Sequence, residues 1–353
     1  MARILLVGAG HAHLPVLAQA GALVRAGHDV GLISPGRFHA CCHAAPILAG
    51  SGETEQGVPL SRLVTGGKVH LFEDAVIGID PVAREVHQHE GTPLAYDILS
   101  LSVGSLPRPL PGTENHPRCF VPKPFPRLLA LRDALRERFT RHPGRPVALV
   151  IAGGGLTAVE LAMAILTLAA HSGGQTVITI LCRGQLLTKL PERAGIRIIE
   201  KLAAAGTILQ ERAAVERVEE NEAVLTNGDR IAFDLFINAT GLTPPPLAGV
   251  SGLPVTADGA IRVDGTLRVE GMPDLLAAGD CSNAPGPALH HGRTLARNLL
   301  ALANGQPLRP LPAIKPGHRL ALGDEGLIHS GNRWWLGRSA LWLKRWHDRR
   351  LPG

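Results

Sequence analysis

The chain has 353 residues with 45% apolar and 19% charged side chains, which is enough for a buried core and excludes a disordered segment or a small disulfide-stabilised module. Aromatic residues make up only 3%, fewer than an all-β sandwich or a protein that recognises RNA by base stacking would carry. The formal net charge of +6 favours anionic partners, and the five scattered cysteines favour a reducing, cytoplasmic compartment.

The first predicted unit lies at the N-terminus. An apolar strand over residues 4–7 ends in the glycine turn 8–10, which opens a helix, and a second strand follows. In such a β-turn-α-β unit the glycines permit a tight turn and let a pyrophosphate approach the backbone, while the helix N-terminus favours its charge. The third glycine of the ideal motif is replaced by His13. The second strand ends at Ser34 rather than at a ribose-binding acid, so Ser34 or another group must serve the adenosine ribose.

A second unit of the same kind follows a Pro-rich linker over 107–126 and a predicted helix over 125–141. The apolar stretch 147–170 resembles a membrane span, but the glycine triplet 153–155 divides it into a strand and a helix. We therefore predict no membrane span. The next strand ends at Arg183 without an acid. Arg183 would tolerate a 2′-phosphate, which favours NADPH over NADH; the alternative is a solvated surface cation.

The rest of the chain continues the alternation of strands and helices. A hairpin is predicted around 227–229, strands over 234–238 and 274–278, and a helix over 288–303. Parallel strands need helical crossovers, so we predict an α/β fold. It comprises two Rossmann-like (ββα three-layer) dinucleotide-binding domains, the second inserted in the first, plus a C-terminal helical segment. The predicted boundaries are 1–113 with 239–312 for the FAD-binding domain, 114–238 for the NAD(P)-binding domain and 313–353 for the C-terminal segment.

The C-terminal segment carries all four tryptophans, between Trp334 and Trp346. On a helix, Trp335, Trp342 and Trp346 would share one stripe. Tryptophan beside arginine and lysine is typical of a helix that lies on a membrane surface, so we expect a peripheral position on the inner face of the cell membrane. A stripe that covers the flavin or a homodimer partner is the alternative. The positive charge then indicates a docking surface and phosphate binding, and we expect no nucleic-acid partner.

The segment around Asp280 carries a family resemblance. With the preceding strand 274–278 it is similar to the second FAD fingerprint of the two-dinucleotide-binding-domain flavoproteins, the pyridine nucleotide-disulfide oxidoreductase superfamily. The stretch GGGLTAVELA over 153–162 resembles the nicotinamide loop of type II NADH dehydrogenases. Over essentially the whole chain, VGAGHAHL, LISPGR, YDILSLSVGSLP, VPKPF and AAGDC resemble the FAD-dependent oxidoreductase domain that some bacteria fuse to selenide, water dikinase.

The resemblance implies two cofactors, FAD and NAD(P)H. Asp280 would bind the flavin ribityl chain, and Glu160 would lie near the nicotinamide. The implied FAD contacts are Gly8, Gly10, His11, Ala12, His13, Ser34, Arg37, Val76, Gly104, Gly241, Gly279 and Asp280. The contacts expected for the nicotinamide dinucleotide are Gly153, Gly155, Glu160 and Arg183. No metal is expected.

Two pairs of residues are candidates for chemistry beside the flavin. Cys41 and Cys42 lie where the disulfide reductases carry a Cys-x4-Cys pair, but here they are adjacent and flanked by histidines. A flavin-facing thiol there could act as a nucleophile; buried thiols that fill space are the alternative. His290 and His291 stand where type II NADH dehydrogenases have a pair of glutamines beside flavin and quinone. At a helix N-terminus they would help to stabilise reduced anionic flavin, with surface histidines as the alternative.

Three functions are consistent with these features. The first is an FAD enzyme that takes hydride from NAD(P)H and passes electrons to a quinone or another small acceptor. The second is a flavin enzyme of sulfur or selenium chemistry, sulfide:quinone-like or thiol-dependent, that uses Cys41 and Cys42. The third is a flavin-bound accessory protein, docked on a membrane, without turnover.

Overall fold

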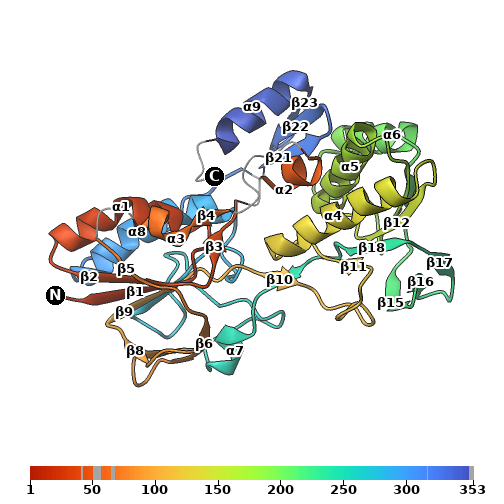
Figure 1. The fold of residues 1–353 in the computed structure, drawn as a ribbon. Helices are drawn as coiled ribbons and strands as arrows, with labels where there is room; N and C mark the ends of the chain where they lie inside the picture. The colour runs from red at the N-terminus through yellow and green to blue at the C-terminus, as the bar shows by residue number, and fades with distance from the viewer. Residues whose placement is uncertain (41–42, 51–56, 65–67, 316, 350–353) are drawn as a thin grey trace.

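The computed structural model describes residues 1–40, 43–50, 57–64, 68–315 and 317–349. Two parallel five-stranded sheets form the centres of two units, which lie side by side in Figure 1 and are joined by a narrow pair of strands. The predicted α/β fold built on two such units is therefore confirmed. The two sheets draw their strands from the two sets of residues assigned to the two domains, while the domain boundaries themselves stay a prediction.

The first sheet has the order β20-β9-β1-β2-β5, with all neighbours parallel. Its strands are β1 (Arg3–Val7), β2 (Asp29–Ile33), β5 (His70–Phe72), β9 (Ile98–Leu101) and β20 (Leu275–Ala277). Along β1, Ile4 and Leu6 pack on one side and Leu5 and Val7 on the other. Because successive side chains of a strand point to opposite faces, the unbroken apolar run marks a strand buried on both sides.

Helices cover one face of this sheet and a small antiparallel sheet covers the other (Figure 1). The helices are α1 (Leu14–Arg25), α3 (Leu60–Leu63) and α8 (Ala288–Ala303). On the other face lie β6 (Val76–Asp80), β7 (Glu85–Gln88), β8 (Leu94–Ala95) and α7 (Leu247–Val250), and a separate pair is formed by β3 (Arg37–Phe38) and β4 (Val58–Pro59). Alternating apolar residues on β1 thus build two cores, one under the helices and one under the small sheet.

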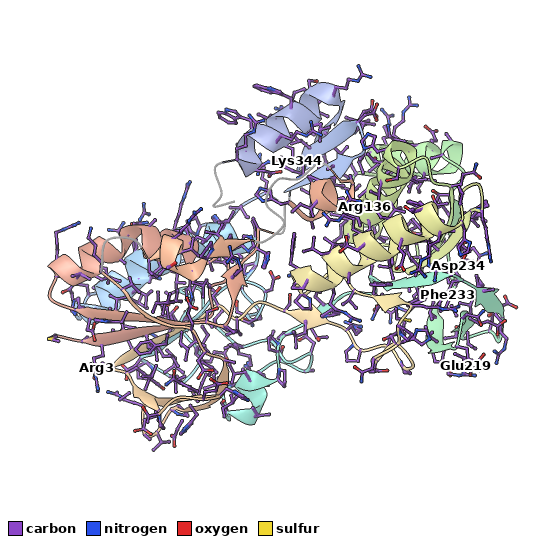
Figure 2. The ribbon with its side chains drawn as sticks, in the orientation of Figure 1. Arg3, Arg136, Glu219, Phe233, Asp234 and Lys344 are labelled. Atoms are coloured by element: carbon purple, nitrogen blue, oxygen red, sulfur yellow. The ribbon has the colours of Figure 1, made fainter. Side chains whose placement is uncertain are left out.

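The second sheet repeats this plan with the order β11-β18-β12-β13-β14, again parallel throughout. Its strands are β11 (Cys119–Phe120), β12 (Val147–Ala152), β13 (Thr176–Leu181), β14 (Ile208–Gln210) and β18 (Leu235–Asn238), and its helices are α4 (Phe125–Arg141), α5 (Leu156–His171) and α6 (Glu192–Ala204). The antiparallel strands β15 (Val215–Glu219), β16 (Glu222–Leu225) and β17 (Arg230–Ala232) cover the opposite face. β10 (Leu106–Pro107) and β19 (Leu242–Thr243) pair antiparallel where the chain crosses between the units. In Figure 2, the labelled residues Phe233 and Asp234 lie directly before β18, the strand that leads back to the crossover.

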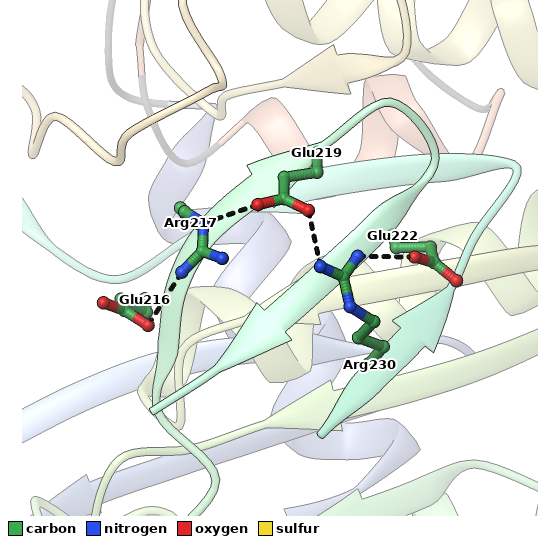
Figure 3. Close-up of polar contacts among 5 residues, drawn as sticks. All are labelled: Glu216, Arg217, Glu219, Glu222 and Arg230. Atoms are coloured by element: carbon green, nitrogen blue, oxygen red, sulfur yellow. Dashed lines mark hydrogen bonds and ion pairs between the residues drawn. The ribbon is translucent and has the colours of Figure 1, made fainter. Parts of the chain in front are cut away.

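An alternating row of charges lines the outer surface of β15 to β17 (Figure 3). Arg217 contacts Glu216 and Glu219, and Arg230 contacts Glu219 and Glu222, over distances of 2.7 to 3.0 Å. All five side chains are well exposed, so each pair contributes little to stability. The charges mark this side of the small sheet as a solvated face.

The C-terminal segment differs from its prediction. It forms an antiparallel sheet of β21 (Gly317–Leu322), β22 (Glu325–Ser330) and β23 (Arg333–Gly337), followed by α9 (Arg338–Asp348). The placement of Trp335 in a helical stripe is therefore wrong: it lies on β23, paired with Ile328, and only Trp342 and Trp346 lie on α9. The three strands show no regular alternation of apolar and polar residues, since β21 ends in three consecutive buried residues, so the period of a strand did not identify them in the sequence.

This C-terminal module (residues 317–348) packs on the second unit. Leu320, Leu322 and Leu327 belong to the same apolar core as α4 and α5. The short helix α2 (Ala44–Leu48), which follows the first unit's second strand in sequence, enters that core as well, and Figure 1 shows it between α5 and the module. Among the described residues, no helix is long and apolar enough to cross a membrane.

Candidate functional site

The first glycine turn lies where β1 ends beside β9. A Cβ on Gly8 would lie 2.5 Å from the carbonyl oxygen of Ser102, and one on Gly10 would lie 2.4 Å from the same oxygen. Gly8 also has a positive φ of 85°, a conformation that favours glycine. The backbone is therefore packed as closely as a dinucleotide turn requires. No described side chain caps α1, and its first turn has no acid, so its amide groups remain suited to a phosphate.

His13 replaces the third glycine and joins the turn to the neighbouring strand. Its Nδ1 donates to the Gly8 carbonyl at 2.6 Å, which leaves Nε2 to accept from the Ser100 hydroxyl at 2.9 Å. The side chain is completely buried, and burial lowers the pKa of His13 to about 4. The neutral imidazole thus takes over the packing that a glycine provides in the ideal motif.

Four further residues expected to contact FAD come from different elements of the first unit. The Ser34 hydroxyl accepts the Ala9 N–H at 3.1 Å, so it braces the turn from the end of β2. Arg37 begins β3 and donates to the Gly57 carbonyl at 3.0 Å. Val76 begins β6, and Ala12 is fully buried beneath the turn.

Asp280 follows β20 and forms the polar centre of the first site. Its Oδ2 lies 3.1 Å from Lys123 Nζ and accepts the Ser105 hydroxyl at 3.0 Å. These contacts hold the pKa of Asp280 below its usual value against the opposing effect of burial. His11 faces this group, and burial, with Lys123 next, lowers the pKa of His11 to about 4. The site therefore offers one carboxylate, one ammonium and one neutral imidazole.

His290 and His291 both bind backbone groups. His291 is buried; its Nδ1 accepts the Gly279 N–H at 3.0 Å and its Nε2 donates to the Pro285 carbonyl at 3.0 Å. Burial lowers the pKa of His291, so the neutral ring supports the second fingerprint from behind. His290 donates to the Pro312 carbonyl at 2.8 Å. These contacts favour positioning roles, and the predicted catalytic roles remain untested.

The second glycine turn is tighter than the first. A Cβ on Gly153 would lie 2.1 Å from the Ala239 carbonyl oxygen, and one on Gly154 would lie 2.0 Å from the Cys182 Sγ. A Cβ on Gly155 would meet nothing within 4 Å, which leaves the side of the turn that a ligand would approach open. No described side chain caps α5, and no acid lies in its first turn. Arg183 is exposed just beyond β13.

Glu160 faces the C-terminal module. Its Oε1 accepts the Ala321 N–H of β21 at 2.7 Å, and burial raises the pKa of Glu160. The buried ion pair between Lys344 and Asp348, 2.7 Å long, lies on the facing side of α9; Figure 2 labels Lys344 there. The expected position of Glu160 near a nicotinamide stays a prediction.

The paired crossover lies between the two sites. Gly104 and Gly241 flank β10 and β19 with φ of 73° and 136°. Asn238 accepts the Thr240 N–H and hydroxyl and donates to the Arg108 carbonyl at 2.9 Å. The crossover is thus fixed by glycine conformation and by an amide network.

Cys41 and Cys42 lie outside the described residues. Of their flanking histidines, His39 stacks on Phe125 with ring centroids 4.5 Å apart, and burial lowers its pKa, so a neutral His39 offers a thiolate little support. Burial raises the pKa of Cys119 to about 12 and that of Cys281 to about 11. Both thiols are therefore protonated near neutral pH and unsuited to nucleophilic attack.

Ser100, Ser102 and Ser105 lie in the YDILSLSVGSLP stretch that carried the resemblance, and 102–105 resembles the family's crossover segment, but the sequence assigned a contact neither to these serines nor to Lys123. Lys123 stands within the VPKPF stretch that carried the resemblance, but no role was attached to it. Nothing in the local pattern could place it beside Asp280, because the two residues are 157 positions apart.

Two glycine turns at the ends of two parallel sheets are consistent with the family to which the chain is similar. A model of the pyridine nucleotide-disulphide oxidoreductases matches residues 2–297, so the chain belongs to that family. It is 28% identical over 294 residues to demethylphylloquinone reductase NdbB of Synechocystis, covering 77% of this chain and 71% of that protein. It is 28% identical over 298 residues to human (Homo sapiens) ferroptosis suppressor protein 1, covering 80% and 76%.

Solved structures share the fold. Sulfide:quinone oxidoreductase of Aquifex aeolicus matches with a TM-score of 0.84 at 14% identity, covering 99% of this chain and 90% of that chain. Water-forming NADH oxidase of Lactobacillus brevis bound to NADH matches with a TM-score of 0.76 at 21% identity, covering 93% and 75%. FAD and a pyridine nucleotide are the cofactors of the family, which confirms the predicted cofactors.

Proposed function

We propose that this chain is an FAD-dependent oxidoreductase that takes hydride from NAD(P)H and passes the electrons to a quinone or another small acceptor. The observation that carries the proposal is the pair of tight glycine turns, each opening a helix that no described side chain caps, at the ends of two parallel sheets. Parallel α/β sheets bind dinucleotides at such turns. FAD, when bound, supplies the hydride acceptor and electron donor that side chains lack.

The residues divide this work between the two sites. Gly8, Gly10 and the N-terminus of α1 are suited to the FAD diphosphate, and Asp280 is suited to its ribityl hydroxyls. At the second turn, Gly153 and Gly155 are suited to the nicotinamide dinucleotide. The strands β10 and β19 connect the two units, and we propose that the two bound cofactors approach each other across this crossover, as a hydride transfer requires.

A quinone acceptor is supported by the names of the relatives. One is a demethylphylloquinone reductase, and another, the internal alternative NAD(P)H-ubiquinone oxidoreductase A1 of Solanum tuberosum, is 27% identical over 141 residues, or 38% of this chain. The narrower kinship with the domain fused to selenide, water dikinase stays part of the proposal, on the stretches quoted for it. Sulfur chemistry through Cys41 and Cys42 is not favoured by the neutral His39.

The test is reduction of the purified full-length chain under anaerobic conditions. We expect a flavin absorption spectrum that bleaches on addition of NADH or NADPH and recovers on addition of a soluble quinone such as menadione. Arg183→Ala should lower kcat/KM for NADPH about tenfold or more and leave NADH within about twofold, because only NADPH carries the 2′-phosphate. A chain without flavin, or a flavin that neither nucleotide bleaches, would contradict the proposal.

We also propose that the C-terminal module docks on an anionic membrane surface. Trp335, Trp342 and Trp346 are 44%, 66% and 41% exposed, and four arginines of β23, α9 and its C-cap are exposed as well: Arg333, Arg338, Arg345 and Arg349. The acid on α9, Asp348, is paired with Lys344 on the buried side. Aromatic rings ringed by cations suit the interface of an anionic bilayer.

Vesicle sedimentation tests this docking. The wild-type chain should bind phosphatidylglycerol vesicles and lose affinity at high salt, whereas the Trp335→Ser/Trp342→Ser/Trp346→Ser variant should bind at least tenfold more weakly. Ile77→Ser/Val82→Ser/Val250→Ser is the matched control, because these exposed apolar residues lie on or beside β6 and α7, away from α9 in Figure 1. Equal binding by all three chains would refute membrane docking through the tryptophans.

A further inference from the structure

Lys123 joins three distant segments of the chain at one carboxylate. It lies in the segment between β11 and α4, both elements of the second unit. Its Nζ is 3.1 Å from Asp280 Oδ2 and donates to the Ser105 hydroxyl at 3.2 Å, while Ser105 donates to the same carboxylate oxygen at 3.0 Å. The end of β20, the crossover and the linker are thus held together by a closed triangle of charge-assisted hydrogen bonds.

The charges around the first glycine turn indicate why a cation is placed next to Asp280. The turn 8–13 contains no lysine or arginine, and its two histidines are neutral because their pKa values fall to about 4. Asp280 adds a negative charge to the place where the FAD diphosphate would bring two more. Like charges so close repel each other, and a nearby cation offsets that repulsion. The Lys123 ammonium supplies that cation.

Folding stability alone does not account for the pair. The side chains of Lys123 and Asp280 are 35% and 47% exposed, and ion pairs of such exposure contribute little to the stability of a fold. Asp280 nevertheless has a fixed orientation, with both partners on one oxygen. Its other carboxylate oxygen remains available as an acceptor for a sugar hydroxyl.

We infer that Lys123 is a positioning residue of the FAD site: it fixes the Asp280 carboxylate for the ribityl hydroxyls and offsets its repulsion from the diphosphate. The inference rests on the proposed FAD-dependent function. It makes a segment of the second unit, between β11 and α4, part of the flavin site, so that one residue outside both glycine turns contributes to the affinity for the cofactor.

Flavin titration tests the role of Lys123. The full-length chain, stripped of flavin, is titrated with FAD and the quenching of flavin fluorescence is followed. We expect Lys123→Met to raise the Kd for FAD about tenfold and Lys123→Arg to raise it less than about threefold, since arginine keeps the charge. The exposed Lys68→Met is the control. Thermal unfolding of the flavin-free Lys123→Met chain should stay near that of the wild type.

A double-mutant cycle with Asp280→Asn separates this role from a general one. In the Asp280→Asn chain, Lys123→Met should change the Kd less than about threefold, because the carboxylate that Lys123 orients is gone. A Lys123→Met chain that binds FAD like the wild type would overturn the inference, and so would a tenfold loss in both backgrounds. If the wild-type chain itself binds no FAD, the proposed function fails. That result can be told apart from failure of the inference about Lys123, because the wild type, the Lys123 variants and the Lys68→Met control would then all fail to quench flavin fluorescence.

Discussion

His13 shows how one residue can depart from a motif and preserve its purpose. A glycine at that position would let helix and strand pack directly, whereas the imidazole fills the gap and bonds to both sides, to Gly8 and to Ser100. Burial favours the neutral ring, because protonation would place a charge in the core and reverse the hydrogen bond to Ser100, whose hydroxyl would then have to accept. The motif thereby acquires a dependence on pH that glycine lacks.

The stability of the fold should therefore fall in mild acid. The pKa of His13 is about 4 in the folded chain, against 6.5 for the free side chain. Below pH 6.5 the unfolded chain binds a proton that the folded chain refuses, so this contribution is fully present above pH 6.5 and is lost as the pH falls toward 4. The loss is up to about 1.4 kcal/mol per pH unit. Denaturant unfolding of the flavin-free chain at several pH values measures it.

His13→Gln is the matched variant for this measurement. The glutamine amide can still donate and accept but does not titrate, so the dependence of unfolding free energy on pH should become shallower between pH 6.5 and 4. His142→Gln, at an exposed position, is the control. An unchanged pH dependence in His13→Gln would show that His13 does not carry the effect.

Among the helices and strands, those defined by residues close together in the sequence were predicted correctly. The helices Phe125–Arg141 and Ala288–Ala303 begin and end as predicted, because apolar spacing and flanking proline determine both. The C-terminal strands were missed because Trp335 was assigned to the same helical stripe as Trp342 and Trp346, whereas it lies on β23 and pairs with Ile328. The triangle at Asp280 was missed for another reason: Lys123 and Ser105 reach it only through the fold.

In the second glycine turn, Gly154 and Gly155 should respond differently to substitution by alanine. Gly154→Ala should destabilise the chain by about 1–3 kcal/mol, because the new methyl group would overlap the Cys182 Sγ, 2.0 Å away. Gly155→Ala should leave stability within about 0.5 kcal/mol, since nothing lies within 4 Å, but should weaken NAD(P)H binding, because the methyl group occupies the face that the pyrophosphate approaches. Thermal unfolding and nucleotide titration measure the two effects, and identical behaviour of both variants would disprove the distinction.

At the scale of the whole molecule, the C-terminal module is part of the second unit's interior. The family match ends at residue 297, yet strands beyond it contribute to the core of α4 and α5. Lys201 of α6 also contacts Asp324 and Glu325 at the β21–β22 turn, at 3.3 and 2.9 Å. The module thus has an inner face that stabilises the second unit and an outer face with exposed tryptophans.

Two substitutions within the module should separate these faces. Leu327 is completely buried, so Leu327→Ala should cost about 2–4 kcal/mol through lost burial and a cavity. Trp342 is larger but 66% exposed, so Trp342→Ala should cost less than about 1 kcal/mol and affect vesicle binding instead. Hydrogen exchange of α5 locates the damage: faster exchange in Leu327→Ala, with α5 protected in Trp342→Ala, is expected because Leu327 shares its core. If α5 exchanged equally slowly in both variants, the module would be an independent appendage rather than a part of the second unit.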